Sequence, residues 1–192
     1  MDPVIVAGLG NPGAPYTGTR HNVGFRVADE LGRRHRAAWV PCAGPGLEAR
    51  CLVREQPVLL LKPLTYMNGS GAAVTAALDR HQVPAERLLV VVDDIALPLG
   101  RLRMRPGGSD GGHNGLGSVI QELATEAIPR LRCGIAGEEP PTGELLRDFV
   151  LSPFALQEVP EAEVMIRRAA DMVEEFAVSG IEAAMNICNS GT

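Results

Sequence analysis

The chain has no apolar run approaching the ~20 residues that a membrane-spanning helix needs. Its longest aliphatic stretches, such as residues 88–92, fall far short of that length, and its first residues form neither a signal peptide nor an arginine-rich presequence. We therefore expect a soluble, cytoplasmic protein. A length of 192 residues with 45% hydrophobic residues suffices for a buried core, so disorder is excluded and one domain, residues 1–192, is predicted.

Cysteines with the spacing of a metal site are also missing. The four cysteines form no C-x-x-C pair, and no histidine lies near them at metal-ligand spacing. Neither a zinc site nor a disulfide framework is therefore predicted, and free thiols fit the cytosol.

Lysine is nearly absent, and the net charge is not positive. Lys62 stands beside 17 arginines, and the formal net charge of −5 argues against a nucleic-acid binder held by bulk positive charge. However, residues 1–137 carry 15 basic and 12 acidic side chains, whereas residues 138–192 carry 3 and 11. A local arginine patch in the first part is thus compatible with a nucleic-acid partner and a modest salt dependence. The alternative is that the arginines reflect coding bias alone.

Short aliphatic runs alternate with segments of helical periodicity along the chain. The predicted strands are residues 4–7, 49–54, 58–62, 88–92, 101–105, 131–136 and 149–151. The predicted helices begin near residue 22, at residue 70 with Ser70 as cap, near residue 116 and within a C-terminal helical region, 153–188, that breaks near Gly180. This alternation predicts an α/β fold, a single domain with a twisted, mixed and largely parallel sheet flanked by helices on both faces.

The first predicted strand leads into a G-x-G-x-x-G loop, the pattern of a dinucleotide-binding turn. An enzyme with a nucleotide cofactor is one hypothesis, but it rests on this loop alone. Prolines 12 and 15 and Gly18 keep the chain irregular until about His21, so no helix begins within the turn. We therefore interpret the glycines as residues that turn the backbone tightly and let it approach a ligand.

His21 stands at a loop-to-helix junction, where a single histidine is commonly a capping or solvated residue. Asp93 and Asp94 follow the strand 88–92, and the carboxyl ends of parallel strands are where ligands bind. A carboxylate that accepts a hydrogen bond from one imidazole nitrogen raises the basicity of the other. Because no G-x-S-x-G elbow is present, we expect direct attack by water that the histidine activates.

Asparagines beside glycine occur at three comparable places, and each is most simply a turn former. Together, Asn11, Asn68 and Asn114 could instead hold a carbonyl and stabilise a developing oxyanion. The glycine-rich segment 106–117 is predicted to be a lid loop near the substrate. It has no P-loop signature, which excludes the usual phosphate loop.

Five arginines fall in two short segments beside this loop. Alternation predicts one shared strand face for Arg101, Arg103 and Arg105, with Arg130 and Arg132 on a neighbouring strand. Such a face is either a solvated surface or a phosphate-binding patch, and the sequence leaves both open.

Taken together, these segments resemble the bacterial-type peptidyl-tRNA hydrolase family. The matching residues are 8–13 (GLGNPG), Tyr16, 19–24 (TRHNVG), 62–68 (KPLTYMN), Asp93 and Asp94, 111–115 (GGHNG) and 130–132 (RLR). They occur in order from residue 4 to about residue 185, and an ordered set is far more specific than any one motif.

The resemblance implies hydrolysis of the ester between a peptide and the 3′ ribose of tRNA, which frees tRNA for translation. Peptidyl-tRNA is then the partner, and the family is usually monomeric and needs no metal, organic cofactor, membrane or obligate protein partner. By motif match, His21 is the general base on water, Asp93 orients it, and Asn11 discriminates N-blocked from free aminoacyl-tRNA. The matched substrate-binding residues are Tyr16, Tyr66, Asn68 and Asn114, and the matched clamp on the tRNA 5′ phosphate is Arg105 with Arg132.

Two residues depart from the family pattern. Ala96 stands where the family often has an acidic residue, and Asp110 occupies a lid position that is usually small or neutral. An anion in the lid would weaken the approach of phosphate. The alternative function is a non-catalytic RNA-binding module of the same fold, as in plastid relatives; the intact His21, Asp93 and asparagines favour the enzyme.

Overall fold

The computed structural model describes residues 2–137 and 141–190, and these residues form one seven-stranded sheet with the order β2-β3-β4-β1-β5-β7-β6. The four central strands are parallel. Strands β3 and β6 pair antiparallel to β4 and β7 of this group, and β2 pairs antiparallel to β3. The strands are β1 (Val4–Gly8), β2 (Val40–Pro41), β3 (Gly46–Val53), β4 (Gln56–Pro63), β5 (Leu88–Pro98), β6 (Leu102–Arg105) and β7 (Arg130–Ala136). The predicted mixed sheet is confirmed.

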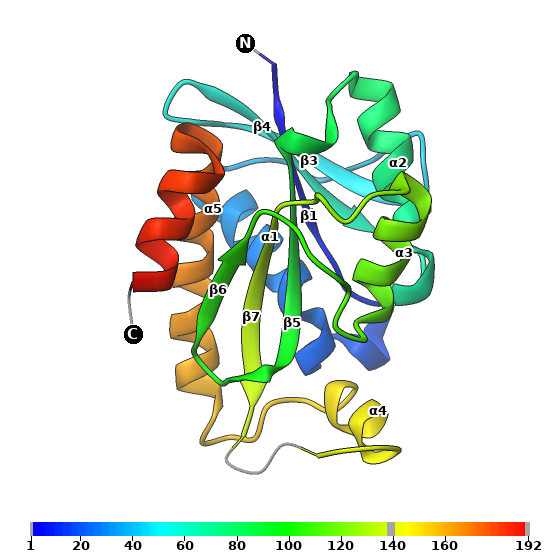
Figure 1. The fold of residues 1–192 in the computed structure, drawn as a ribbon, viewed down its shortest axis with the longest axis vertical. Coiled ribbons are helices and arrows are strands. Elements are labelled where there is room, and N and C mark those ends of the chain that lie inside the picture. The colour runs from blue at the N-terminus through cyan, green and yellow to red at the C-terminus, as the bar shows by residue number, and fades with distance from the viewer. Residues whose placement is uncertain (1, 138–140, 191–192) are drawn as a thin grey trace.

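Helices cover both faces of the sheet, as predicted (Figure 1). They are α1 (Val23–Arg34), α2 (Ser70–His81), α3 (Asn114–Leu123), α4 (Leu145–Val150) and α5 (Val159–Ser190), with α1 and α5 on one face and α2 and α3 on the other. Alternate residues of β1 feed the two cores: Val4 and Val6 face α1 and α5, and Ile5 and Ala7 face α2 and α3.

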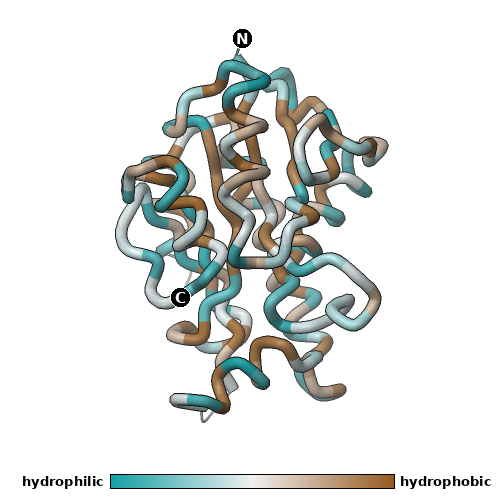
Figure 2. Tube along the Cα trace, turned by 90° about the vertical axis from the view of Figure 1, so that its right-hand side faces the viewer, coloured by the Kyte–Doolittle hydropathy of each residue, from teal (hydrophilic) through white to brown (hydrophobic). Residues whose placement is uncertain are grey.

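The hydrophobic residues run through the middle of the molecule in Figure 2, along the central strands. Parallel strands buried on both faces need such continuous aliphatic runs. None of the helices in the described residues is long and apolar enough to cross a membrane.

The glycine loop after β1 packs against the protein itself. A Cβ atom at Gly8 would lie 2.2 Å from the carbonyl oxygen of Gly24 in α1, and a Cβ atom at Gly10 would lie 2.7 Å from the Phe25 ring. The close neighbour of these two glycines is therefore α1 and not the ligand that the pattern suggested. Only the three-residue 3-10 helix Ala14–Tyr16 begins at the end of the loop. Because α1 begins only at Val23, no α-helix N-terminus lies there to receive a pyrophosphate.

Two sequence-based expectations about elements were wrong. Residues 149–151 were predicted as a strand, but Phe149 and Val150 end helix α4, because a short apolar run has no periodicity that separates strand from helix. Ser70 does not cap α2 through its side chain: its hydroxyl donates to the carbonyl of Met67, and Gly69 is the N-cap. The break in the last helix at Gly180 is confirmed by its φ of 79°.

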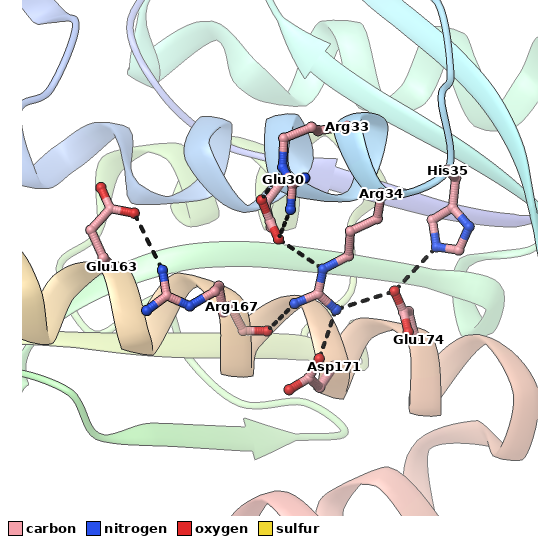
Figure 3. Close-up of polar contacts among 8 residues, drawn as sticks. All are labelled: Glu30, Arg33, Arg34, His35, Glu163, Arg167, Asp171 and Glu174. Carbon is pink, nitrogen blue, oxygen red and sulfur yellow. Dashed lines mark hydrogen bonds and ion pairs between the residues drawn. The ribbon is translucent and has the colours of Figure 1, made fainter.

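An ion-pair network joins α1 to α5 (Figure 3). The guanidinium of Arg34 donates to Glu30 at 2.8 Å, to Asp171 at 2.6 Å and to the carbonyl of Arg167 at 2.9 Å. Hydrogen bonds from Arg33 and Arg34 lower the pKa of Glu30 to about 2. The network therefore holds the long C-terminal helix α5 against α1 while its carboxylates are ionised.

Replacing Arg34 with methionine should destabilise the fold by about 1–2 kcal/mol at pH 7, since one guanidinium serves several acceptors on two helices. The pKa of Glu30 is lowered, so its stabilising contribution is complete above about pH 4.5 and is lost as the pH falls toward 2. Urea unfolding at pH 7 and pH 3 should thus show a smaller Arg34→Met effect at pH 3. Arg33→Met is the control, because Arg33 contacts only Glu30 in this network, and it should lower the free energy of unfolding less than Arg34→Met does. An Arg34→Met cost that is equal at both pH values would contradict this account.

Candidate active site

The C-terminal ends of the central parallel strands open into a cleft of about 1180 Å³. Open α/β sheets bind ligands at this edge. The glycine-rich loop and helix α4 form two of its walls. The loop was predicted to run over residues 106–117 but ends at His113, because α3 begins at Asn114. All nine residues predicted for the site line this cleft: Asn11, Tyr16, His21, Tyr66, Asn68, Asp93, Arg105, Asn114 and Arg132.

Two histidines share one carboxylate oxygen in the cleft. His21 lies in the short 3-10 helix Arg20–Asn22 (η2), and its Nδ1 is 2.7 Å from Oδ1 of Asp93 on β5. His113 is the N-cap of α3, and its Nε2 is 3.0 Å from the same oxygen. The two rings lie 4.9 Å apart. The sequence left open whether Asp93 or Asp94 holds the histidine, and the structure brings Asp93 to it.

The hydrogen bonds fix the tautomers of both rings. Nδ1 of His113 accepts the backbone N–H of Leu116 at 3.1 Å, so its Nε2 carries the proton and donates to Asp93. His21 donates to the same carboxylate through Nδ1, which leaves its Nε2 as an acceptor. Burial raises the pKa of Asp93, but its close contact with His113 and the hydrogen bonds from His113 and His21 outweigh burial and hold the pKa well below its usual range. Asp93 is therefore an anion that stabilises a proton on His21.

The same three residues are the donor set of a conceivable metal site, since their ligand atoms lie within 4.8 Å of one another. A metal on His113 Nε2 would need the lone pair of a nitrogen that carries the proton. The other nitrogen of that ring already accepts the Leu116 N–H. The arrangement thus fits a hydrogen-bonded histidine–carboxylate cluster better than a metal centre.

Asn11 is held by a second amide side chain. Asn22 accepts the backbone N–H of Asn11 at 2.8 Å and donates to its carbonyl at 3.0 Å. The side-chain Oδ1 of Asn11 accepts the backbone N–H of Met67 at 2.8 Å. The amide nitrogen of Asn11 remains as a donor in the cleft.

Polar and aromatic side chains line the mouth of the cleft around this cluster. The rings of Tyr16 and Tyr66 meet edge to face with centroids 6.2 Å apart. Tyr66, Asn68 and Asn114 are exposed within the cleft, so their polar groups are free to meet a ligand. The structure thus brings together the three asparagines that the sequence singled out.

The predicted arginine patch is smaller than expected. Arg103 pairs with Arg132 and Arg105 with Arg130 across β6 and β7, so these four side chains share a face as predicted. However, Arg130 is buried, and its guanidinium donates to the carbonyls of Gly108 at 2.6 Å, Ser109 at 3.0 Å, Glu126 at 3.1 Å and Ile128 at 2.7 Å. Arg130 therefore anchors the glycine-rich loop, and backbone carbonyls take four of its five N–H donors.

The two arginines predicted as the phosphate clamp, Arg105 and Arg132, differ in their surroundings. Arg105 is exposed at the edge of the cleft. Arg132 forms an ion pair through Nε with Asp94, which also accepts the backbone N–H of Ala96 at 2.8 Å. A phosphate that approaches Arg132 must therefore compete with the Asp94 carboxylate for the guanidinium.

Sequence reasoning missed His113, Asn22 and the structural role of Arg130. His113 stands in GGHNG at a loop-to-helix junction, as His21 does in TRHN, so the repeated context was an available signal. No local sequence pattern indicates the roles of Asn22 and Arg130. Asn22 bonds the backbone of Asn11 in the preceding loop, and Arg130 bonds backbone carbonyls, which any residue provides.

Comparison with known proteins gives one consistent result. The model of the family described as peptidyl-tRNA hydrolase matches residues 5–192. The peptidyl-tRNA hydrolase of Methylacidiphilum infernorum is 47% identical over 182 residues, which are 95% of each chain, and that of Listeria monocytogenes is 40% identical over 185 residues, 96% of this chain and 98% of that one. The crystal structure of peptidyl-tRNA hydrolase from Acinetobacter baumannii has a TM-score of 0.90 at 31% identity and covers 98% of this chain and 95% of that one.

Proposed function

We propose, since this chain belongs to the peptidyl-tRNA hydrolase family, that its cleft hydrolyses the ester between a peptide and the 3′ ribose of tRNA. The observation that carries the mechanism is the 2.7 Å contact of His21 Nδ1 with the buried Asp93, inside a cleft that also holds three asparagines. The reaction releases free tRNA and a peptide carboxylate.

In the proposed mechanism His21 is the general base. Its Nε2 takes a proton from a water molecule that attacks the ester carbonyl, and the anionic Asp93 stabilises the imidazolium that forms. The amide N–H groups of Asn68 and Asn114 donate to the developing oxyanion. The intermediate then expels the 3′ oxygen, which receives the proton from His21. His113 supplies the second hydrogen bond to Asp93 and keeps its Oδ1 in line with His21.

The polarity of Asn11 suits discrimination between N-blocked and free aminoacyl groups. Its Oδ1 is engaged by Met67, so the side chain offers its N–H donors to the substrate. The carbonyl of an N-acyl group accepts such a hydrogen bond, whereas a free α-ammonium group only donates. The hydrogen bonds from Asn22 hold this orientation.

The activity itself is tested with purified protein and N-acetyl-aminoacyl-tRNA. We expect release of the N-acetyl amino acid, and much slower release of the amino acid from unblocked aminoacyl-tRNA. Binding of tRNA without release of either product would instead support the non-catalytic RNA-binding module.

The phosphate clamp gives a separate prediction. Replacing the exposed Arg105 with glutamine should raise the Kd for tRNA about 3- to 10-fold at low salt and reduce the slope of log Kd against log salt by about one. Arg36, an exposed arginine outside the cleft, is the charge-matched control for a titration of fluorescent tRNA at several salt concentrations. Equal changes for Arg105→Gln and Arg36→Gln would contradict a clamp at Arg105.

The remaining expectations follow from the same proposal. The reaction needs no metal or organic cofactor, because His21 and the asparagines supply the base and the donors. We place the protein in the cytoplasm as a monomer, with peptidyl-tRNA as its partner.

A further inference from the structure

Arg20, the residue before His21, is a buried arginine to which the hydrolytic mechanism assigns no part. It is 5% exposed, and a buried charge needs close partners. Its Nε has no hydrogen-bond partner, so the contacts of the two Nη atoms stabilise the charge. Its Nη2 lies 2.5 Å from Oε2 of Glu158, and its Nη1 lies 2.9 Å from Oγ of Ser152 and also donates to the carbonyl of Pro153. The guanidinium therefore bridges the segment between α4 and α5.

Two aromatic rings complete the environment of this guanidinium. The Arg20 Cζ lies 4.3 Å from the ring centroid of Phe149 in α4 and 5.1 Å from that of Phe154. Such contacts favour a planar cation and would be weaker with lysine. The backbone adds to the junction, since the N–H of Arg20 donates to the carbonyl of Ser152 at 3.0 Å and Thr19 bridges to Pro153.

The residues that Arg20 bonds, Ser152, Pro153 and Glu158, directly follow a wall of the active-site cleft. Residues 143–151, which include α4, contribute Leu146, Val150 and Leu151 to the cleft lining. In the described part of the chain, every hydrogen bond from an outside side chain to residues 141–153 comes from Arg20. Arg20 is the first residue of η2, and the general base His21 is the next residue of the same helix.

We propose that Arg20 is a positioning residue of the hydrolytic site, which fixes the α4 wall (residues 143–151) over the cleft beside the general base. This inference rests on the proposed function for its effect on substrate. The wall lines the cleft that takes peptidyl-tRNA in the proposed function, so its fixation strengthens substrate binding. The hydrogen bond between His21 and Asp93 is made without Arg20, so the chemical step depends on Arg20 much less than binding does.

The test compares Arg20→Gln with Arg26→Gln. Arg26 is a matched control because it also pairs with a glutamate of the C-terminal region, Glu163 at 2.5 Å, and lies 6.0 Å from the Phe154 ring, but it does not bond the α4 wall. For Arg20→Gln we expect KM for N-acetyl-aminoacyl-tRNA to rise about 10-fold while kcat changes less than about 3-fold, the pattern of lost substrate binding. Hydrogen exchange of the amides of residues 145–151 should become faster in Arg20→Gln and stay unchanged in Arg26→Gln.

Two further, milder variants keep the proposal testable if Arg20→Gln does not fold. Arg20→Lys keeps the charge opposite Glu158 but not the fork that reaches Ser152 and Pro153, and Glu158→Gln removes the charged acceptor alone. Like Arg20→Gln, both variants should raise KM, each by about 3-fold. The proposal would be overturned if folded Arg20→Gln had the same KM and exchange rates as Arg26→Gln. If Arg20→Gln does not fold, the same comparison is made with Glu158→Gln. A large loss of kcat at constant KM would also overturn the proposal, because that pattern would mean that Arg20 acts on the chemical step at His21. If the wild type fails to hydrolyse the ester, the proposed function fails, while the exchange comparison still tests the wall.

Discussion

Replacing His21 with alanine is expected to lower kcat for N-acetyl-aminoacyl-tRNA by ~10²–10⁴-fold, the usual contribution of a positioned general base. Nε2 of His21 is the acceptor left free when Nδ1 donates to Asp93, so the variant loses the group that takes the proton from water. The Kd for tRNA should stay nearly unchanged, because the phosphate contacts are assigned to Arg105 and Arg132. Single-turnover release of the N-acetyl amino acid measures this loss directly.

His81→Ala is the matched control for that experiment. His81 ends α2, pairs with Glu48 at 3.2 Å and does not line the cleft. It should retain the wild-type rate. Equal single-turnover rates for His21→Ala and the wild type would remove the general base from the mechanism.

The second large effect is expected for Asp93→Asn, which should lower kcat by ~10²–10⁴-fold. An amide at this position loses the charge that stabilises the His21 imidazolium. It also presents a donor that can turn the ring into the wrong tautomer. The pKa of Asp93 is held well below its usual range, so the carboxylate is ionised at every practical assay pH and the acid limb of the rate profile belongs to another group.

Asp94→Asn is the neighbouring control. Asp94 pairs with Arg132 rather than with a histidine, so its replacement should change KM and salt dependence and leave kcat within about 3-fold. Circular dichroism and thermal unfolding show whether both variants are folded. Equal losses of kcat in Asp93→Asn and Asp94→Asn would contradict the assignment of Asp93 to His21.

Much of the fold follows from periodicity in the sequence. The run 88–92 predicts a buried strand because Val and Leu are needed on both faces, and β5 does begin at Leu88. It continues through Asp93 and Asp94 to Pro98, since a strand does not end where its side chains become polar. Helix α4 was missed because three consecutive apolar residues suit a strand or a helix equally.

The gathering of the site residues could also be predicted, because the carboxyl ends of parallel strands meet at one edge of the sheet. What the sequence could not give is how the side chains divide their hydrogen bonds. His113 reaches the same oxygen as His21 from a residue 20 positions after Asp93, and only the fold brings them together. Likewise, the alternation that exposes Arg105 gives no sign that Arg130 is buried against backbone carbonyls.

The central claim is that water activated by His21 attacks the ester directly, without a covalent intermediate on the protein. Rapid-quench kinetics with N-acetyl-aminoacyl-tRNA in tenfold excess over enzyme follow free tRNA and the N-acetyl amino acid separately. Direct attack predicts that the two products appear together, in equal amounts and at one rate throughout. A burst of free tRNA, equal to the enzyme concentration and ahead of the acid, would reveal an acyl-enzyme and contradict the account.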